Sequence, residues 1–167
     1  PESLLYFGSS IPVHVATLRN SFSYKSWNLS VNLQAKLGYH FFRNGFSDYS
    51  AATFWQTHQD YAMRWQKPGD EAFTHVPSLS YPLNNNRSEF YKRSDVLVEK
   101  GDHIRIQDIS VSYSVNQFAG FKNVQINAYC SNLNILIWKA TELDIDPLYE
   151  NALPYPLSIS IGIRANL

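Results

Sequence analysis

The clearest pattern in the sequence is a strict alternation of apolar and polar residues at its end. From Leu157 to Leu167 every odd position is apolar and every even position is Ser, Gly, Arg or Asn. A period of two places the apolar side chains on one face of a β-strand. Roughly 9–11 residues suffice for a tilted strand to cross a bilayer, and this stretch reaches that length. A half-buried strand of a soluble sheet alternates in the same way.

A second alternating stretch predicts a β-hairpin with a two-residue turn at Lys25 and Ser26. Outward from this turn the predicted pairs lie on one face: Tyr24 with Trp27, Phe22 with Leu29, and Leu18 with Leu33. The second strand alternates without a break as far as Phe41, whereas strands of soluble proteins usually span about 5–6 residues. This length favours a membrane strand that continues beyond the bilayer.

Further alternation predicts five strands in all, over about 13–25, 27–42, 103–115, 122–138 and 157–167. A β-bulge near Gln107 and Asp108 reconciles two registers in the third strand. Short and long connections alternate along the chain, which is typical of bacterial barrels with short periplasmic turns and long extracellular loops. The sequence therefore predicts an all-β fold of antiparallel up-and-down strands in a transmembrane β-barrel.

Residues of about 43–100 lose the alternation and are predicted to form a long extracellular loop that holds short helical or strand pieces, with Thr53–Trp65 as a candidate for one helix. Loops of this length are usually functional. Trp55, Tyr61 and Trp65 are candidates for contact with a substrate or a partner protein, because exposed aromatic rings offer a large contact area. The alternative is that they pack the loop against itself.

Four aromatic residues near the ends of alternating runs are candidates for a different role. Aromatic side chains are enriched where a membrane protein crosses the two interfaces of the bilayer. We expect such an interfacial girdle at Tyr24, Trp27, Tyr39 and Trp138.

Charge and composition remove several classes of function. The 14 basic and 14 acidic residues balance, and this argues against a nucleic-acid surface. The only cysteine, Cys130, excludes an internal disulfide bond and a cysteine-rich zinc site. No catalytic constellation is present, so we expect neither an enzyme nor a cofactor.

No metal site is predicted either. The five histidines, at positions 14, 40, 58, 75 and 103, lack the spacing of zinc ligands, so we expect them to be solvated or to face a barrel lumen. Asp144, Asp146 and Glu150 offer oxygen atoms to calcium, but a turn before Pro147 explains them more simply.

Two further features concern the extent of the chain. It begins at Pro1 without an initiator Met, so we expect a fragment of a longer protein. The run Ile135–Trp138 is far shorter than the ~20 residues of a membrane-spanning helix. Any contact with a membrane is thus expected to be made by strands.

Several segments together resemble one protein family. They are LRNSFSYKSWNLSVNLQAKLGY, RWQKPGDE, VPSLSYP, VEKGDHIRIQDISVSYSV, NVQINAYCSNLNIL, DIDP and YPLSISIGIRANL. In this order and at this spacing, the chain resembles the C-terminal portion of a SusC/RagA-type TonB-linked (TonB-dependent) outer-membrane transporter. One departure is Leu167, because such barrels commonly end in Phe.

The resemblance implies the last five strands of a 22-stranded barrel whose lumen is closed by a separate plug domain. It implies import of glycans or peptides across the cell outer membrane, a SusD-type surface lipoprotein as partner, and energy from the TonB complex. The alternative is a soluble all-β glycan-binding module. In the barrel, Arg is expected to be costly at Val31 or Ile161 on the lipid side and mild at Asn32 or Ser160.

Overall fold

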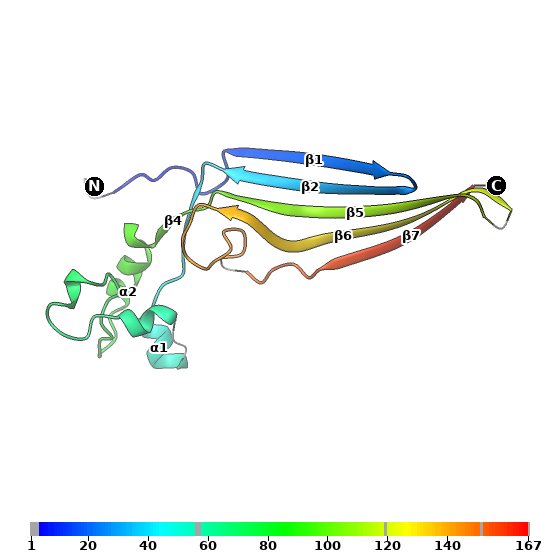
Figure 1. The fold of residues 1–167 in the computed structure, drawn as a ribbon. Coiled ribbons are helices and arrows are strands. Elements are labelled where there is room, and N and C mark those ends of the chain that lie inside the picture. Colours follow the sequence, from blue (N-terminus) through cyan, green and yellow to red (C-terminus); the bar gives the residue numbers. More distant parts are fainter. Residues whose placement is uncertain (1–3, 56–57, 119, 151, 167) are drawn as a thin grey trace. The chain divides into compact units, whose positions relative to one another are not determined.

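The protein folds into two compact units in a computed structural model that describes residues 4–55, 58–118, 120–150 and 152–166 (Figure 1). Unit 1 comprises Pro1–Gly8 and His40–Glu99, and unit 2 comprises Ser9–Tyr39 and Lys100–Leu167. The strands are β1 (His14–Tyr24), β2 (Trp27–Leu37), β3 (His40–Phe42), β4 (Val98–Lys100), β5 (His103–Phe118), β6 (Phe121–Lys139) and β7 (Ser158–Asn166). The α-helices are α1 (Asp48–Phe54) and α2 (Asn85–Lys92), and short 3₁₀ helices span Gln59–Met63, Asp70–Ala72 and Asp95–Leu97.

Unit 2 is one antiparallel sheet of five strands in the order β1-β2-β5-β6-β7. The turns between β1 and β2 and between β5 and β6 lie at the same end of this sheet (Figure 1). The long connections leave from its other end. Within the described residues β1 and β7 each have a neighbour on one side only, so this sheet is open and does not close on itself.

The predicted hairpin is confirmed with its register. Tyr24 pairs with Trp27, Phe22 with Leu29 and Leu18 with Leu33, in that order away from the turn. Lys25 adopts a left-handed conformation with φ 53° in this turn. A positive φ at the first turn residue matches the twist of the two strands.

β2 ends at Leu37, before the predicted end near residue 42. Gly38 has a φ of 79°, a conformation open mainly to glycine. The carboxylate of Asp102 accepts hydrogen bonds from the backbone N–H groups of Gly38 and Tyr39, at 2.6 and 3.3 Å. The chain therefore leaves the sheet here, and residues 40–42 form β3, which pairs with β4.

The bulge predicted in β5 is confirmed. Leu33 pairs with Ile106 and Asn32 pairs with Asp108, so Gln107 is the extra residue. β6 is irregular opposite this bulge, where Asn132 and Asn134 have φ angles of 56° and 53°. Their side-chain amides donate to backbone carbonyls just before β7, Pro156 O at 3.2 Å and Tyr155 O at 3.1 Å.

Unit 1 contains the segment that was predicted to be a loop, and it has a hydrophobic core of its own. The buried side chains are Phe41, Phe46, Val76, Tyr91 and Leu97. Gly45 allows this packing, because a Cβ there would lie only 3.0 Å from the ring of Tyr91 and 3.1 Å from Leu97. Two ion pairs support this core, Arg43 with Asp60 at 2.6 Å and Arg87 with Asp48 at 3.0 Å.

A single helix over Thr53–Trp65 is wrong. α1 begins after Ser47, whose hydroxyl accepts from the N–H of Ser50, and it ends at Phe54 because Trp55 turns to φ 54°. Residues 56 and 57 lie outside the described chain, and a separate 3₁₀ helix follows at Gln59–Met63. Among the described residues, no helix is long and apolar enough to cross a bilayer.

Candidate membrane interface and polar face

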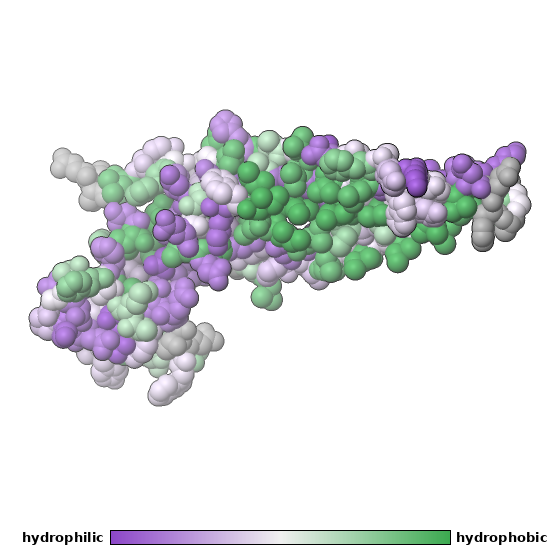
Figure 2. Space-filling view, viewed as in Figure 1, coloured by the Kyte–Doolittle hydropathy of each residue, from purple (hydrophilic) through white to green (hydrophobic). Residues whose placement is uncertain are grey.

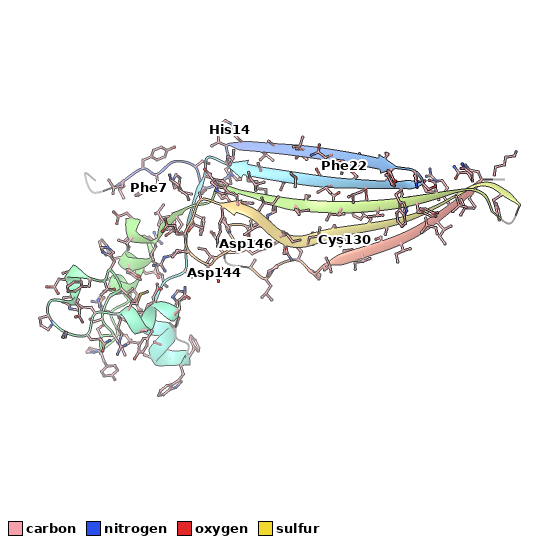
Figure 3. All side chains as sticks on the ribbon, viewed as in Figure 1. Phe7, His14, Phe22, Cys130, Asp144 and Asp146 are labelled. Carbon is pink, nitrogen blue, oxygen red and sulfur yellow. The ribbon has the colours of Figure 1, made fainter. Side chains whose placement is uncertain are left out.

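The sheet of unit 2 carries one continuous apolar face across all five strands. We call it the apolar face. Three rows of paired residues run across it, each with one residue from each strand: Tyr24–Trp27–Tyr113–Ile126–Ile163, Phe22–Leu29–Val111–Ala128–Ile161 and Asn20–Val31–Ile109–Cys130–Ile159. Phe22 and Cys130 of this face are labelled in Figure 3. Only Asn20 interrupts the apolar character of these rows.

The large side chains of the apolar face are exposed. Phe22 is 62% exposed, Ile161 75% and Ile163 73%. Hydrophobic residues cover the sheet as a broad band in Figure 2. Soluble monomers rarely leave so large an apolar surface uncovered, and such surfaces mark contact with a membrane or another protein.

The sheet of unit 2 exposes apolar side chains and buries polar ones, which is the reverse of the core of a soluble protein. Apart from Tyr39 and Pro147, the buried apolar side chains among the described residues all lie in unit 1. The buried side chains of unit 2 are instead mostly polar or charged: Asn32, His103, Arg105, Asp108 and Thr141. Soluble proteins bury apolar residues and place almost all charges in water.

Three of the four predicted girdle residues lie at the two ends of the apolar face. Tyr24 and Trp27 flank the β1–β2 turn, and the ring of Trp27 is tilted against that of Tyr113 at 4.7 Å between centroids. Trp138 lies at the other end, paired with Ile104, which also pairs with Ala35. From Trp27 to Ala35 the strand covers about 27 Å at ~3.4 Å per residue, close to the ~25 Å apolar band of outer-membrane barrels.

The structure places Tyr39 differently. Its side chain is buried and its hydroxyl lies 3.2 Å from Nδ1 of His103. Burial, followed by the charge of Glu150, raises the pKa of Tyr39 to about 12. Tyr39 is thus enclosed by unit 2 and has no surface to offer to lipid.

His103, expected to be solvated or in a lumen, is fully buried instead. Its Nδ1 lies 2.8 Å from the carbonyl oxygen of Gly101. Because a carbonyl oxygen only accepts, Nδ1 carries the proton and donates to it. This hydrogen bond therefore links the first residue of β5 to Gly101, which directly follows β4.

The polar face of the sheet, opposite the apolar face, holds a charged group at its centre. Asp108 accepts a hydrogen bond from the side-chain amide of Asn32 at 2.8 Å. The guanidinium of Arg19 lies 3.5 Å from the other carboxylate oxygen. Asp108 is buried, so this neighbourhood stabilises a carboxylate that would otherwise be costly to remove from water.

A second group on the polar face surrounds Arg105, which is buried and forms an ion pair with Asp146 at 2.6 Å. The same Asp146 oxygen accepts from the N–H of Leu148 at 2.9 Å, across Pro147. The described residues contain no group of three metal-ligating side chains. Asp144 is exposed and lies 3.9 Å from Lys139, and Figure 3 labels both aspartates.

Beside Arg105 lies a cavity of about 330 Å³, which we call the polar-face cavity. Lys36 and Gln34 of β2, Gln107 of β5, and Tyr149 and Tyr155 from the 140–157 connection contribute to its lining. These polar-face residues were not predicted as a site. The available signal was Lys36, the one charged residue of β2, and Arg105 in β5, both at polar positions of their strands.

The three aromatic candidates of unit 1 do not meet. Trp55 is 90% exposed, directly after α1. Tyr61 packs on Phe46 and carries the guanidinium of Arg64 at 3.9 Å over its ring. The indole N–H of Trp65 donates to Lys67 O at 2.5 Å. In the part of the chain that the structure describes, no ring contact joins them, and Trp55 is the one most available to a partner.

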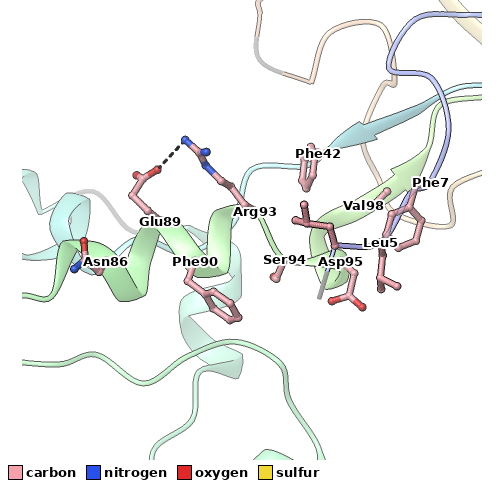
Figure 4. Close-up of a pocket in the computed structure, with 11 residues that line it drawn as sticks. Leu5, Phe7, Phe42, Asn86, Glu89, Phe90, Arg93, Ser94, Asp95 and Val98 are labelled. Carbon is pink, nitrogen blue, oxygen red and sulfur yellow. Dashed lines mark ion pairs between the residues drawn. The ribbon is translucent and has the colours of Figure 1, made fainter. Parts of the chain in front are cut away.

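Unit 1 also contains a groove that the sequence did not indicate (Figure 4). It has a volume of about 670 Å³ and is lined by Leu5, Phe7, Phe42 and Val98 together with residues of α2. An ion pair between Glu89 and Arg93, at 3.9 Å, lies along its helical side. The apolar run at residues 4–7 was the only signal for it in the sequence.

The fold is similar to part of a solved structure. No family profile and no curated protein matches the chain. Among solved structures, a chain from "Structure of the RagAB peptide importer in the 'open-open' state" aligns over 95% of this chain with a TM-score of 0.65 and 16% identity. The aligned part is 18% of that importer chain. The protein thus has the fold of one part of a much longer importer chain.

Proposed function

We propose that this chain forms five adjacent strands in the barrel wall of a SusC/RagA-type TonB-dependent transporter in the cell outer membrane. The observation that carries the proposal is that the sheet exposes its apolar face and buries charged side chains on its polar face. The apolar face would contact lipid and the polar face would line the lumen. By the family resemblance, these strands would belong to a 22-stranded barrel that is closed by a plug domain.

The transported solute is a nutrient in this proposal, either a peptide or an oligosaccharide. A peptide as the solute is supported by the structural neighbour, which is a peptide importer. A SusD-type lipoprotein on the cell surface and the TonB complex would be its partners, as the family resemblance implies. Unit 1 would lie on the extracellular side, because it is inserted between β2 and β5 at the end opposite the short turns.

This chain would contribute a shaped wall rather than chemistry. Its polar face carries ion pairs and amides that would link neighbouring strands and face a water-filled lumen. Trp55 in unit 1 is exposed and offers a contact surface to the solute or to the lipoprotein. No catalytic step is assigned to any of its residues.

Membrane association tests the proposal. The protein that contains this chain should remain in the outer-membrane fraction after extraction with high salt and with alkaline carbonate. It should also show heat-modifiable migration in gels, since barrels stay folded in SDS until the sample is heated. Recovery in the soluble fraction, or a monomeric folded chain in detergent-free buffer, would support the soluble glycan-binding alternative and overturn the proposal.

A further inference from the structure

Two basic side chains line the polar-face cavity. Lys36 and Arg105 both line it, on neighbouring strands, and none of its described lining residues is acidic. One carboxylate oxygen of Asp146 already accepts hydrogen bonds from Arg105 and from the N–H of Leu148. Lys36 forms no ion pair with any described residue, so its ammonium is available to a ligand in this cavity.

Arg105 also has an unused donor there. Its side chain is only 4% exposed, and its Nη2 donates to Asp146. Within the described residues its Nε has no hydrogen-bond partner. A buried donor without a partner costs free energy, so a ligand that accepts from Nε would gain affinity.

The other lining groups fit a small polar ligand. Gln34 and Gln107 contribute amides, and Tyr149 and Tyr155 belong to the segment that borders the cavity. Asn132 and Asn134 bind the backbone of the same segment and fix it beside the sheet. About 330 Å³ lies at the lower end of the range for small-molecule sites.

We propose that the polar-face cavity binds the carboxylate group of a solute, with Lys36 and Nε of Arg105 as donors to its oxygen atoms. The remaining volume would hold the adjoining peptide or sugar unit. The carboxylate belongs either to the C-terminus of a short peptide or to an acidic sugar. This inference rests on the proposed transporter, in which the polar face lines the lumen.

Calorimetric titration of the whole transporter in detergent tests the site with matched probes. N-acetyl-trialanine is compared with its neutral C-terminal amide, and glucuronate with glucose. At least one carboxylate probe should bind about tenfold or more tightly than its neutral partner, since hydrogen bonds between charged groups are the strong ones. A preference confined to the peptide pair or to the sugar pair identifies the source of the carboxylate.

The variant Lys36→Gln should reduce this binding about tenfold, and Lys25→Gln should leave it unchanged. Lys25 is the matched control because it lies in the β1–β2 turn, with its ammonium over the ring of Tyr24. Heat-modifiable migration checks that both variants retain the barrel. Equal binding of charged and neutral probes, or equal effects of the two variants, overturns the inference. A transporter that is intact in the membrane yet lacks this preference leaves the proposed function standing.

Discussion

At the scale of single residues, Gly101 has the least room for a side chain among the described glycines. A Cβ there would collide with the ring of Tyr39, which is itself buried. We expect Gly101→Ala to lower the free energy of unfolding by about 1–3 kcal/mol, the usual range for overpacking. Gly162→Ala is the control, because nothing lies within 4 Å of a Cβ on Gly162; its effect should stay within about 0.5 kcal/mol. Denaturant titration of the protein in detergent measures both, and equal losses would contradict the packing described for Tyr39.

The two faces of the sheet also make a residue-scale prediction. Arg at Val31 or Ile161 on the apolar face should cost about 2–4 kcal/mol near the middle of the bilayer, whereas Ser160→Arg on the polar face should be mild. Asn32 is not a suitable polar-face control, contrary to the sequence-based expectation, because it is buried and bound to Asp108. Urea titration of folding into lipid vesicles gives the free energies. Similar costs at Ile161 and Ser160 would argue against one lipid-facing surface.

At the scale of elements, the bulge in β5 keeps both halves of the strand on the correct faces. Gln107 is the extra residue, so its deletion leaves the pairing of Ile106 with Leu33 and of Asp108 with Asn32 unchanged. Deletion of Ser110 has a different result, because it shifts one half of the strand by one residue and turns its apolar side chains to the other face. We expect the first variant to fold in detergent and the second to fail, as judged by heat-modifiable migration. Failure of both, or folding of both, would contradict the assigned register.

The same elements show what the sequence could predict. Alternation alone located the hairpin, its pairs and the bulge, because a period of two and one apolar face determine a strand register. It missed the end of β2, since Tyr39 and Phe41 continue the pattern although Gly38 has left the sheet. Unit 1 was not predictable as a folded unit, because its core joins residues as distant as Phe46 and Leu97. The polar-face cavity was missed for the same reason, because the 140–157 connection supplies part of its lining.

At the scale of the whole molecule, the two open edges predict that this chain needs the rest of a barrel. In the part of the chain that the structure describes, β1 and β7 each lack a neighbour on one side, and an unpaired backbone group in lipid costs several kcal/mol. We expect the amides of β7 to exchange hydrogen slowly in the complete transporter. In the isolated chain, the amides of β7 that point away from β6 should exchange quickly, or the chain should associate through this edge. Slow exchange along all of β7 in a monomer of the isolated chain would refute this view.

The central claim is that one sheet separates lipid from water by its two faces, and spin-label accessibility along β7 tests it most directly. Single cysteines at Ser158, Ile159, Ser160, Ile161, Gly162 and Ile163 would carry the label in the transporter in lipid vesicles, with Cys130 replaced by Ser. The account predicts a period of two. Collisions with oxygen should be frequent at the three isoleucine positions, and collisions with a water-soluble nickel complex should be frequent at the other three. A water-accessible label at every position, or no alternation, would contradict the claim.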